Sequence, residues 1–325
     1  MADPECQLER VGCLRHLTMA ILSVSCVVGV LGNGLVLWMT LFRMTSTVTT
    51  VWFFNLALAD FLVLLSLPVS IYIVANGWWP SAGLVCRLYM AFLILNFFAS
   101  IYLLVLISVD RCILVLYPVW ARNHRTVRRA TWLAIVVWLL AAAACSPSLK
   151  YRTVDNIKGC EQCFFNFSSH KKPPLDWSLV DTNQQMALAV AHFLLGFLVP
   201  LSIISTCAYL IRAKLRREGW VHASRPKTLL VVLVSAFFIF WFPFNLGLLV
   251  ESKLLPSWGH SYLSILWVTF SLGCFNSCLN PFLYVFIGRD FQQRFFQSAS
   301  SALARAFGEE GFISSCPGGK SPRRW

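Results

Sequence analysis

The most informative segment of this chain, at residues 86–117, reads CRLYMAFLILNFFASIYLLVLISVDRCILVLY. No residue from Leu88 to Val109 carries a charge, and Asp110 and Arg111 then follow together. At 1.5 Å per residue this uncharged run rises roughly 33 Å, about one hydrocarbon thickness of a bilayer. The pattern predicts a transmembrane helix with a cysteine near one membrane surface and an acid–arginine pair at the other.

The composition extends this prediction to the whole chain. Hydrophobic residues make up 58% and charged residues 13% of the sequence, whereas a soluble domain is about 45–50% apolar. Apolar segments near the ~20 residues needed to span a bilayer recur at 17–41, 51–74, 88–109, 130–149, 187–211, 229–250 and 262–287. The alternating pattern of a membrane barrel is absent. We therefore predict an all-α membrane protein, a seven-transmembrane helix bundle within residues 17–287.

The charges predict how the bundle is oriented. Of the 27 Lys and Arg residues, 18 fall after spans 1, 3, 5 and 7, while the other side carries nine basic against eight acidic residues. Positive residues remain on the cytoplasmic side, so the N-terminal tail (1–16) is expected outside the plasma membrane. The net charge of +13 is then mostly a charge facing membrane lipids. Basic residues spread over separate loops do not favour a nucleic-acid partner.

The sequence also predicts the nature of the segments before span 1 and after span 7. The first 16 residues carry three acids and show no cleavable signal pattern. After span 7, apolar residues recur every four positions through 288–307, which predicts an amphipathic eighth helix lying in the membrane interface. Residues 308–325 are expected to form a cytoplasmic tail.

Few polar residues lie inside the predicted spans, and several of them share one face of a helix. Asp60 is a carboxylate well inside an apolar span, where such residues are expensive and usually functional. Asn96 and Ser100 share one face of span 3, and Asn276 and Asn280 share one face of span 7. These oxygen atoms suit a hard cation such as sodium. The alternative is a neutral, hydrogen-bonded Asp60 with no ion.

One group per span gives a far more specific pattern than any single motif. In chain order the groups are Asn33, Asp60, Asp110-Arg111, Trp138, Pro200, Trp241-x-Pro243 and Asn280-Pro281-x-x-Tyr284. With them, the chain resembles a rhodopsin-class G-protein-coupled receptor across all seven spans, and more narrowly the formyl-peptide-receptor branch of chemoattractant receptors. The stretches that carry this resemblance are SVDRCILVLYPVWARNHRT (108–126), CFFNFS (163–168), SRPKTLLVVLVSAFFIFWFPFN (224–245) and NPFLYVFIGRDFQ (280–292).

The resemblance implies a receptor, not an enzyme, that transmits an extracellular signal in inflammation to a Gi-type heterotrimeric G protein and to arrestin. It implies that Arg111 contacts the G protein, that Asp110 restrains Arg111 at rest and that Cys112 completes the motif. The activation switches implied in this way are Trp241, Pro243, Asn280, Pro281 and Tyr284. An allosteric sodium ion is implied at Asp60, Asn96, Ser100, Asn276 and Asn280.

The loop between spans 4 and 5 offers two cysteines, Cys160 and Cys163, and an oxidising exterior favours a bridge to Cys86. The resemblance assigns Cys163 to that bridge, and leaves Cys160 with Cys6 or Cys13 as alternative partners. Asn166 begins an Asn-x-Ser sequon and is predicted to be glycosylated.

The ligand pocket is expected between these loops and Trp241. Its predicted residues are Ile94, Phe97, His192, Phe244, Asn245, Leu248 and Phe270. Ile94 and Leu188 stand where the resemblance implies charged residues in peptide-sensing relatives. Apolar walls beneath the basic residues Lys150, Arg152 and Lys158 favour a lipid mediator or other amphipathic acid. The alternatives are ordinary core packing for the aromatic residues and a satisfied bundle histidine for His192.

One departure from the family pattern keeps a second function open. The activation tyrosine of span 5 is expected eight residues after Pro200, where this chain has Ala208, and Tyr209 lies one position further on. One residue is a ~100° rotation on a helix, so Tyr209 is not expected to face Arg111. A non-signalling decoy or scavenger receptor is therefore the alternative function, and a lipid transporter is a weaker third, since no internal repeat is visible.

Overall fold

The computed structural model describes residues 12–77, 79, 83–157, 160–167, 182–217 and 225–287. For residues 156, 157, 160, 182, 183, 225–233, 251–263 and 282–287 it describes the backbone alone. The predicted eighth helix at 288–307 and the tail at 308–325 lie outside the described residues.

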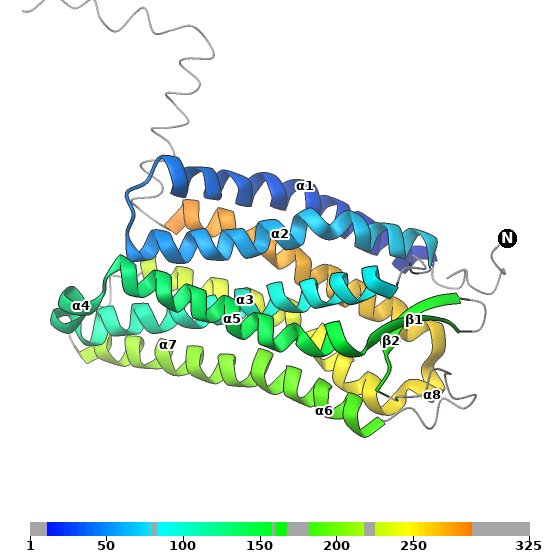
Figure 1. Cartoon of the computed structure of the whole chain (residues 1–325). Coiled ribbons are helices and arrows are strands. Elements are labelled where there is room, and N and C mark those ends of the chain that lie inside the picture. The colour runs from blue at the N-terminus through cyan, green and yellow to red at the C-terminus, as the bar shows by residue number, and fades with distance from the viewer. Residues whose placement is uncertain are drawn as a thin grey trace, which may run out of the picture.

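Long helices make up most of the described chain, arranged side by side as a bundle (Figure 1). The helical elements are α1 (Gly12–Phe42), α2 (Val48–Asn76), α3 (Gly83–Leu116), α4 (Pro118–His124), α5 (Val127–Tyr151), α6 (Thr182–Phe193), the π-helical turn η4 (Leu194–Leu198), α7 (Val199–Arg217) and α8 (Arg225–Ile287). The strands β1 (Arg152–Ile157) and β2 (Cys160–Phe165) pair antiparallel.

Length and composition make five of the described helices able to cross a membrane: Gly12–Phe42, Val48–Asn76, Gly83–Leu116, Val127–Tyr151 and the continuous run Gln184–Arg217. Large apolar side chains remain exposed on these helices and on α8, among them Leu31, Trp132 and Ile239. Such surfaces suit a lipid environment, because lipid tails replace the apolar contacts that water cannot make.

Element α8 holds two of the predicted spans. A straight helix would place Phe240 and Phe275 roughly 50 Å apart at 1.5 Å per residue, yet their ring centroids lie 6.1 Å apart. The element must therefore reverse direction between them, and Figure 1 shows its yellow part and its orange part running back along the bundle. The predicted spans 229–250 and 262–287 correspond to these two parts.

Proline and threonine mark where the helices begin and bend. Thr47 caps α2, since its hydroxyl accepts from the Thr50 amide and the Thr47 amide donates to the Thr50 hydroxyl. Gly77 ends α2 with a φ of 74°, a left-handed conformation that favours glycine. Pro200 is the second residue after η4, and the backbone donor that proline lacks disturbs the helical hydrogen bonds of the turn before it.

The hairpin of β1 and β2 closes one end of the bundle, the same end at which α1 begins, whereas α4 lies at the other end (Figure 1). The pairing places Val154 opposite Cys163. Cys163 is bonded to Cys86 in the first turn of α3, with Cα atoms 5.9 Å apart. The predicted bridge is therefore present, and it ties the hairpin to the central helix.

Candidate functional site

A cavity of about 510 Å³ opens beneath the hairpin and runs into the bundle. Of the predicted pocket residues, the cavity is lined by Ile94, Phe97, His192, Phe244, Leu248 and Phe270. Asn245 is not among the lining residues. Its side chain is buried, and its Nδ2 donates to the Trp241 carbonyl at 2.8 Å, because a residue four positions back on a helix lies directly beneath it.

The inner end of the cavity is aromatic. The Trp241 ring lies edge-on to Phe97 with centroids 4.9 Å apart, and it also contacts Phe244 and Phe270. Gly273 makes this possible, since a Cβ atom there would come within 2.7 Å of the Trp241 ring. The predicted switch residue Trp241 therefore sits at the boundary between the cavity and the deeper bundle.

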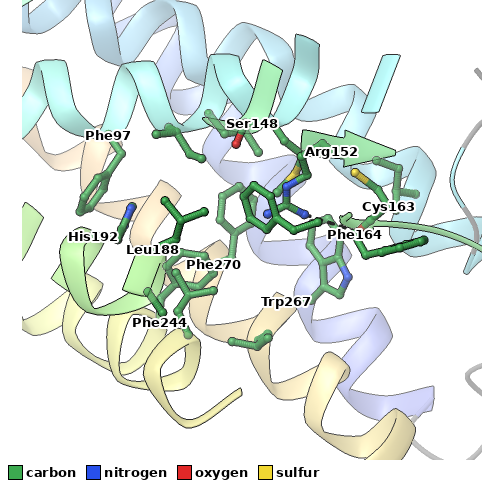
Figure 2. A pocket seen from close by; sticks show the side chains of 18 of the residues that line it. Phe97, Ser148, Arg152, Cys163, Phe164, Leu188, His192, Phe244, Trp267 and Phe270 are labelled. Carbon is green, nitrogen blue, oxygen red and sulfur yellow. Dashed lines mark hydrogen bonds between the residues drawn. The ribbon is translucent and has the colours of Figure 1, made fainter. Parts of the chain in front are cut away.

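His192 is the polar group of this inner end. Its ring stacks on Phe97 with centroids 4.9 Å apart (Figure 2). It also lies edge-on to Phe98. Its Nε2 atom is buried and has no hydrogen-bond partner among the described residues. A buried polar atom without a partner costs free energy, so this arrangement favours a ligand contact over the alternative of a satisfied bundle histidine.

Of the three basic residues predicted above the pocket, Arg152 lines the cavity. It begins β1, its guanidinium lies 4.0 Å over the Phe165 ring, and its Nη1 donates to the Cys163 carbonyl at 3.4 Å. Figure 2 shows its nitrogen atoms among the rings of the cavity wall. Lys150 is exposed instead, with its ammonium 4.9 Å over the Tyr151 ring. Lys158 lies outside the described residues.

Arg15 was not predicted by the sequence reasoning, although it lines the same cavity from the first turns of α1. Its Nε atom is buried without a hydrogen-bond partner among the described residues. A signal for it was available, because Thr18, Leu22 and Ser25 follow it at helical spacing on the buried face of α1. Among the described residues, the lining therefore has the guanidinium groups of Arg15 and Arg152 and the carboxylate of Glu161.

The opposite end of α3 carries the acid–arginine pair, and Asp110 has a different partner from the one expected. Arg125 donates to both of its oxygens, from Nε at 2.7 Å and from Nη2 at 3.0 Å. Arg111 instead donates to the Thr49 hydroxyl at 3.4 Å. Neighbouring residues on a helix point in different directions, so Asp110 faces the chain after α4 rather than Arg111. Cys112 is buried beside them.

The α7 helix carries no tyrosine toward Arg111. Tyr209 is 71% exposed on the outer face, while Cys207 and Ile211 are buried. The expected misorientation of Tyr209 is therefore confirmed.

The predicted sodium ligands lie buried on α2, α3 and α8. Asn280 donates from Nδ2 to Asp60 Oδ2 at 2.6 Å. The Oδ1 atoms of Asn96 and Asn276 are buried and have no hydrogen-bond partner among the described residues. Side-chain oxygen atoms are the ligands that a hard cation prefers, so the residue types present are suitable for the implied ion, while the Asn280–Asp60 bond also fits the alternative of a hydrogen-bonded Asp60 without an ion. Of Tyr284, the structure describes only the backbone.

A helical bundle with a cavity at one end and an acid–arginine pair at the other is typical of a membrane receptor. The family described as 7 transmembrane receptor (rhodopsin family) matches residues 32–284, and this chain belongs to that family.

The relatives narrow the class. The human Probable G-protein coupled receptor 32 is 60% identical over 99% of this chain and 92% of its own length. N-formyl peptide receptor 2 of Macaca mulatta is 42% identical over 91% of this chain and 87% of its own, and Formyl peptide receptor 2 of Mus musculus is 40% identical over 90% and 86%. The chain is thus a G-protein-coupled receptor of the chemoattractant type, a multi-pass plasma-membrane protein and not an enzyme.

Proposed function

We propose that this receptor binds an extracellular lipid mediator or other amphipathic acid and transmits its presence to a Gi-type G protein. The observation that carries the proposal is the cavity, which combines mostly apolar walls with two guanidinium groups near the hairpin. An acyl chain gains free energy by leaving water for such walls, and a guanidinium matches a carboxylate with two parallel hydrogen bonds. His192 would meet a polar group deeper along the ligand.

The neutral residues of the cavity support an acid over a formylated peptide. Ile94 and Leu188 both line it, and both stand where the resemblance implies charge in peptide-sensing relatives. A peptide would bring polar amide groups into an apolar wall that offers them few partners. A fatty-acid-like ligand has one charged end and needs one charged anchor.

Arg111 is the residue proposed to contact the G protein, with the coupling to Gi and the arrestin partner carried over from the resemblance. The excess of basic residues after odd-numbered spans supports an extracellular N-terminus, and antibody access to terminal tags on intact cells would test it. Asn166 is proposed as a glycosylation site, which a gel shift on deglycosylation would test.

The signalling function is tested by ligand-dependent inhibition of cAMP formation in cells that express the receptor. We expect an acidic lipid to lower cAMP, and Arg111→Ala to abolish the response while surface expression and ligand binding persist. A receptor that binds and internalises the lipid without any change in cAMP would contradict this function. It would favour the alternative of a non-signalling decoy receptor, which the outward position of Tyr209 also supports.

We also propose that Asp60, Asn96, Ser100, Asn276 and Asn280 hold a sodium ion in the resting bundle. These residues connect α2, α3 and α8, so they would favour the resting spacing of the three helices. Sodium and agonist should then oppose one another reciprocally. Agonist affinity is expected to be lower in sodium than in potassium or choline at equal ionic strength, and Asp60→Asn should remove the difference. Equal affinity in all three salts would leave the neutral, hydrogen-bonded Asp60 as the better description.

A further inference from the structure

The cytoplasmic end of α3 shows two arginines near a single acid. Asp110 lies within electrostatic range of both Arg111 and Arg125. Arg125 takes both carboxylate oxygens, at 2.7 and 3.0 Å. Arg111 is left with the Thr49 hydroxyl at 3.4 Å, and Arg125 contacts the same hydroxyl at 3.0 Å. The two cations therefore share one neutral acceptor, and only one of them holds the acid.

The backbone around Arg125 is fixed on both sides. Its amide donates to the Ala121 carbonyl at 2.9 Å and so closes α4. On the other side, Thr126 caps α5, and the Arg129 guanidinium donates to the His124 carbonyl at 2.9 Å. The guanidinium of Arg125 is thus held in place before it meets Asp110, which lowers the entropy lost on pairing.

The ion pair of Asp110 and Arg125 is also partly shielded from water, so it can contribute to the stability of this end of the bundle. The side chains of Asp110 and Arg125 are 10% and 22% exposed, and the contact is a two-point guanidinium–carboxylate bond, the strongest geometry for such a pair. A fully exposed ion pair often contributes nothing measurable. This one lies between α2, α3 and the α4–α5 connection.

We propose that Arg125 acts as the counter-ion of Asp110 and thereby keeps Arg111 available to the G protein. Without Arg125, the acid would turn to the cation that remains in range, Arg111, and would hold it against α3. Arg125 is then a positioning residue whose loss restrains Arg111. This inference rests on the proposed role of Arg111 for its effect on signalling, but not for the exchange of partners itself.

The exchange of partners is tested by thermal unfolding of the purified full-length receptor, followed with a thiol-reactive dye that reports the buried cysteines. The coupling between Asp110→Asn and Arg111→Gln is measured twice, once with Arg125 present and once in the Arg125→Gln background. With Arg125 present, we expect the two substitutions to change the unfolding temperature additively. In the Arg125→Gln background, we expect the unfolding temperature of the double variant to depart from additivity by about 1–3 °C. The same coupling in both backgrounds would overturn the proposal.

The consequence for signalling is tested with the same variants and purified Gi, by ligand-independent nucleotide exchange per folded receptor. Arg125→Gln should lower basal exchange roughly two- to fivefold, the range expected for a partly exposed ion pair. Asp110→Asn should relieve that loss in the double variant. Arg122→Gln is the matched control, because Arg122 is an exposed arginine of α4, three residues before Arg125, and it should leave exchange unchanged.

Each outcome of the second experiment has a distinct meaning. A lower unfolding temperature for Arg125→Gln with unchanged basal exchange would show a purely structural loop contact and would overturn the proposal. Absence of exchange in the unsubstituted receptor, even with an acidic lipid present, would contradict the proposed signalling function. The thermal cycle would still decide which residue Asp110 holds.

Discussion

The charged and polar residues that line the mostly apolar cavity are the most informative residues of this receptor. Arg15 and Arg152 approach the cavity from α1 and from the hairpin, which are far apart in sequence. His192 adds a buried nitrogen without a partner among the described residues. A buried nitrogen of this kind costs free energy until a partner meets it, so His192 supports the proposed ligand site.

Arg152 gives the residue-scale prediction. Arg152→Gln keeps the size and polarity of the side chain but removes the charge, so binding of a fluorescent fatty acid to the purified receptor should weaken about tenfold or more. Lys150→Gln is the matched control, because Lys150 is a neighbouring basic residue that is exposed and lies over Tyr151 rather than in the cavity. Equal effects of the two substitutions would show that the general positive charge, and not the anchor, attracts the acid.

Six of the seven predicted pocket residues line the cavity, and the predictions that failed have physical reasons. Phe97, Phe244 and Phe270 follow from their helical register and all line the cavity. Asn245 has the right depth but bonds to the backbone of its own helix, and sequence spacing alone does not distinguish these two uses of an amide. The Asp110–Arg125 pair depends on how the α4–α5 connection folds back, which no local pattern encodes.

At the scale of elements, the spans were predictable and the irregular connections were not. Uninterrupted apolar runs predict α1, α2, α3 and α5 because a bilayer demands about 20 such residues whatever their neighbours are. The hairpin of β1 and β2 was expected only as a loop with a bridge, since its pairing depends on the bundle end that it covers. The π-helical turn η4 was not predicted either.

The bridge between Cys86 and Cys163 gives the element-scale prediction. It holds β2, and with it Phe164 and Arg152 on the neighbouring strand, over the cavity. Removing a native disulfide typically costs about 2–5 kcal/mol, so Cys163→Ser should reduce surface expression and weaken fatty-acid binding by the receptor that remains.

Cys160→Ser is the control for this substitution, because Cys160 lies in the same strand and the partner of Cys86 is Cys163. Flow cytometry of intact cells measures expression, and the fluorescent fatty acid measures binding. If the Cys163 variant were expressed and bound the acid as well as the Cys160 variant, the hairpin would not be the element that positions the basic anchor.

At the scale of the whole molecule, the two ends of the bundle carry different functional groups. The hairpin end holds the cavity, and the α4 end holds Arg111 with its shared acceptor Thr49. The aromatic cluster around Trp241 lies at the inner end of the cavity, and the hydrogen bond from Asn280 to Asp60 joins α8 to α2. We expect a ligand that changes the position of Trp241 to alter the end that carries Arg111, since both groups belong to the same bundle.

The most direct test of this account is nucleotide exchange on Gi in membranes that contain the receptor. An oxidised polyunsaturated fatty acid, its methyl ester and a formylated peptide are compared over a full concentration range. We predict that the free acid stimulates exchange, that the ester needs about a tenfold higher concentration or more because it lacks the charge that Arg152 and Arg15 would bind, and that the formylated peptide is weaker than the acid. Stimulation by the formylated peptide at a lower concentration than any of the lipids would contradict the account.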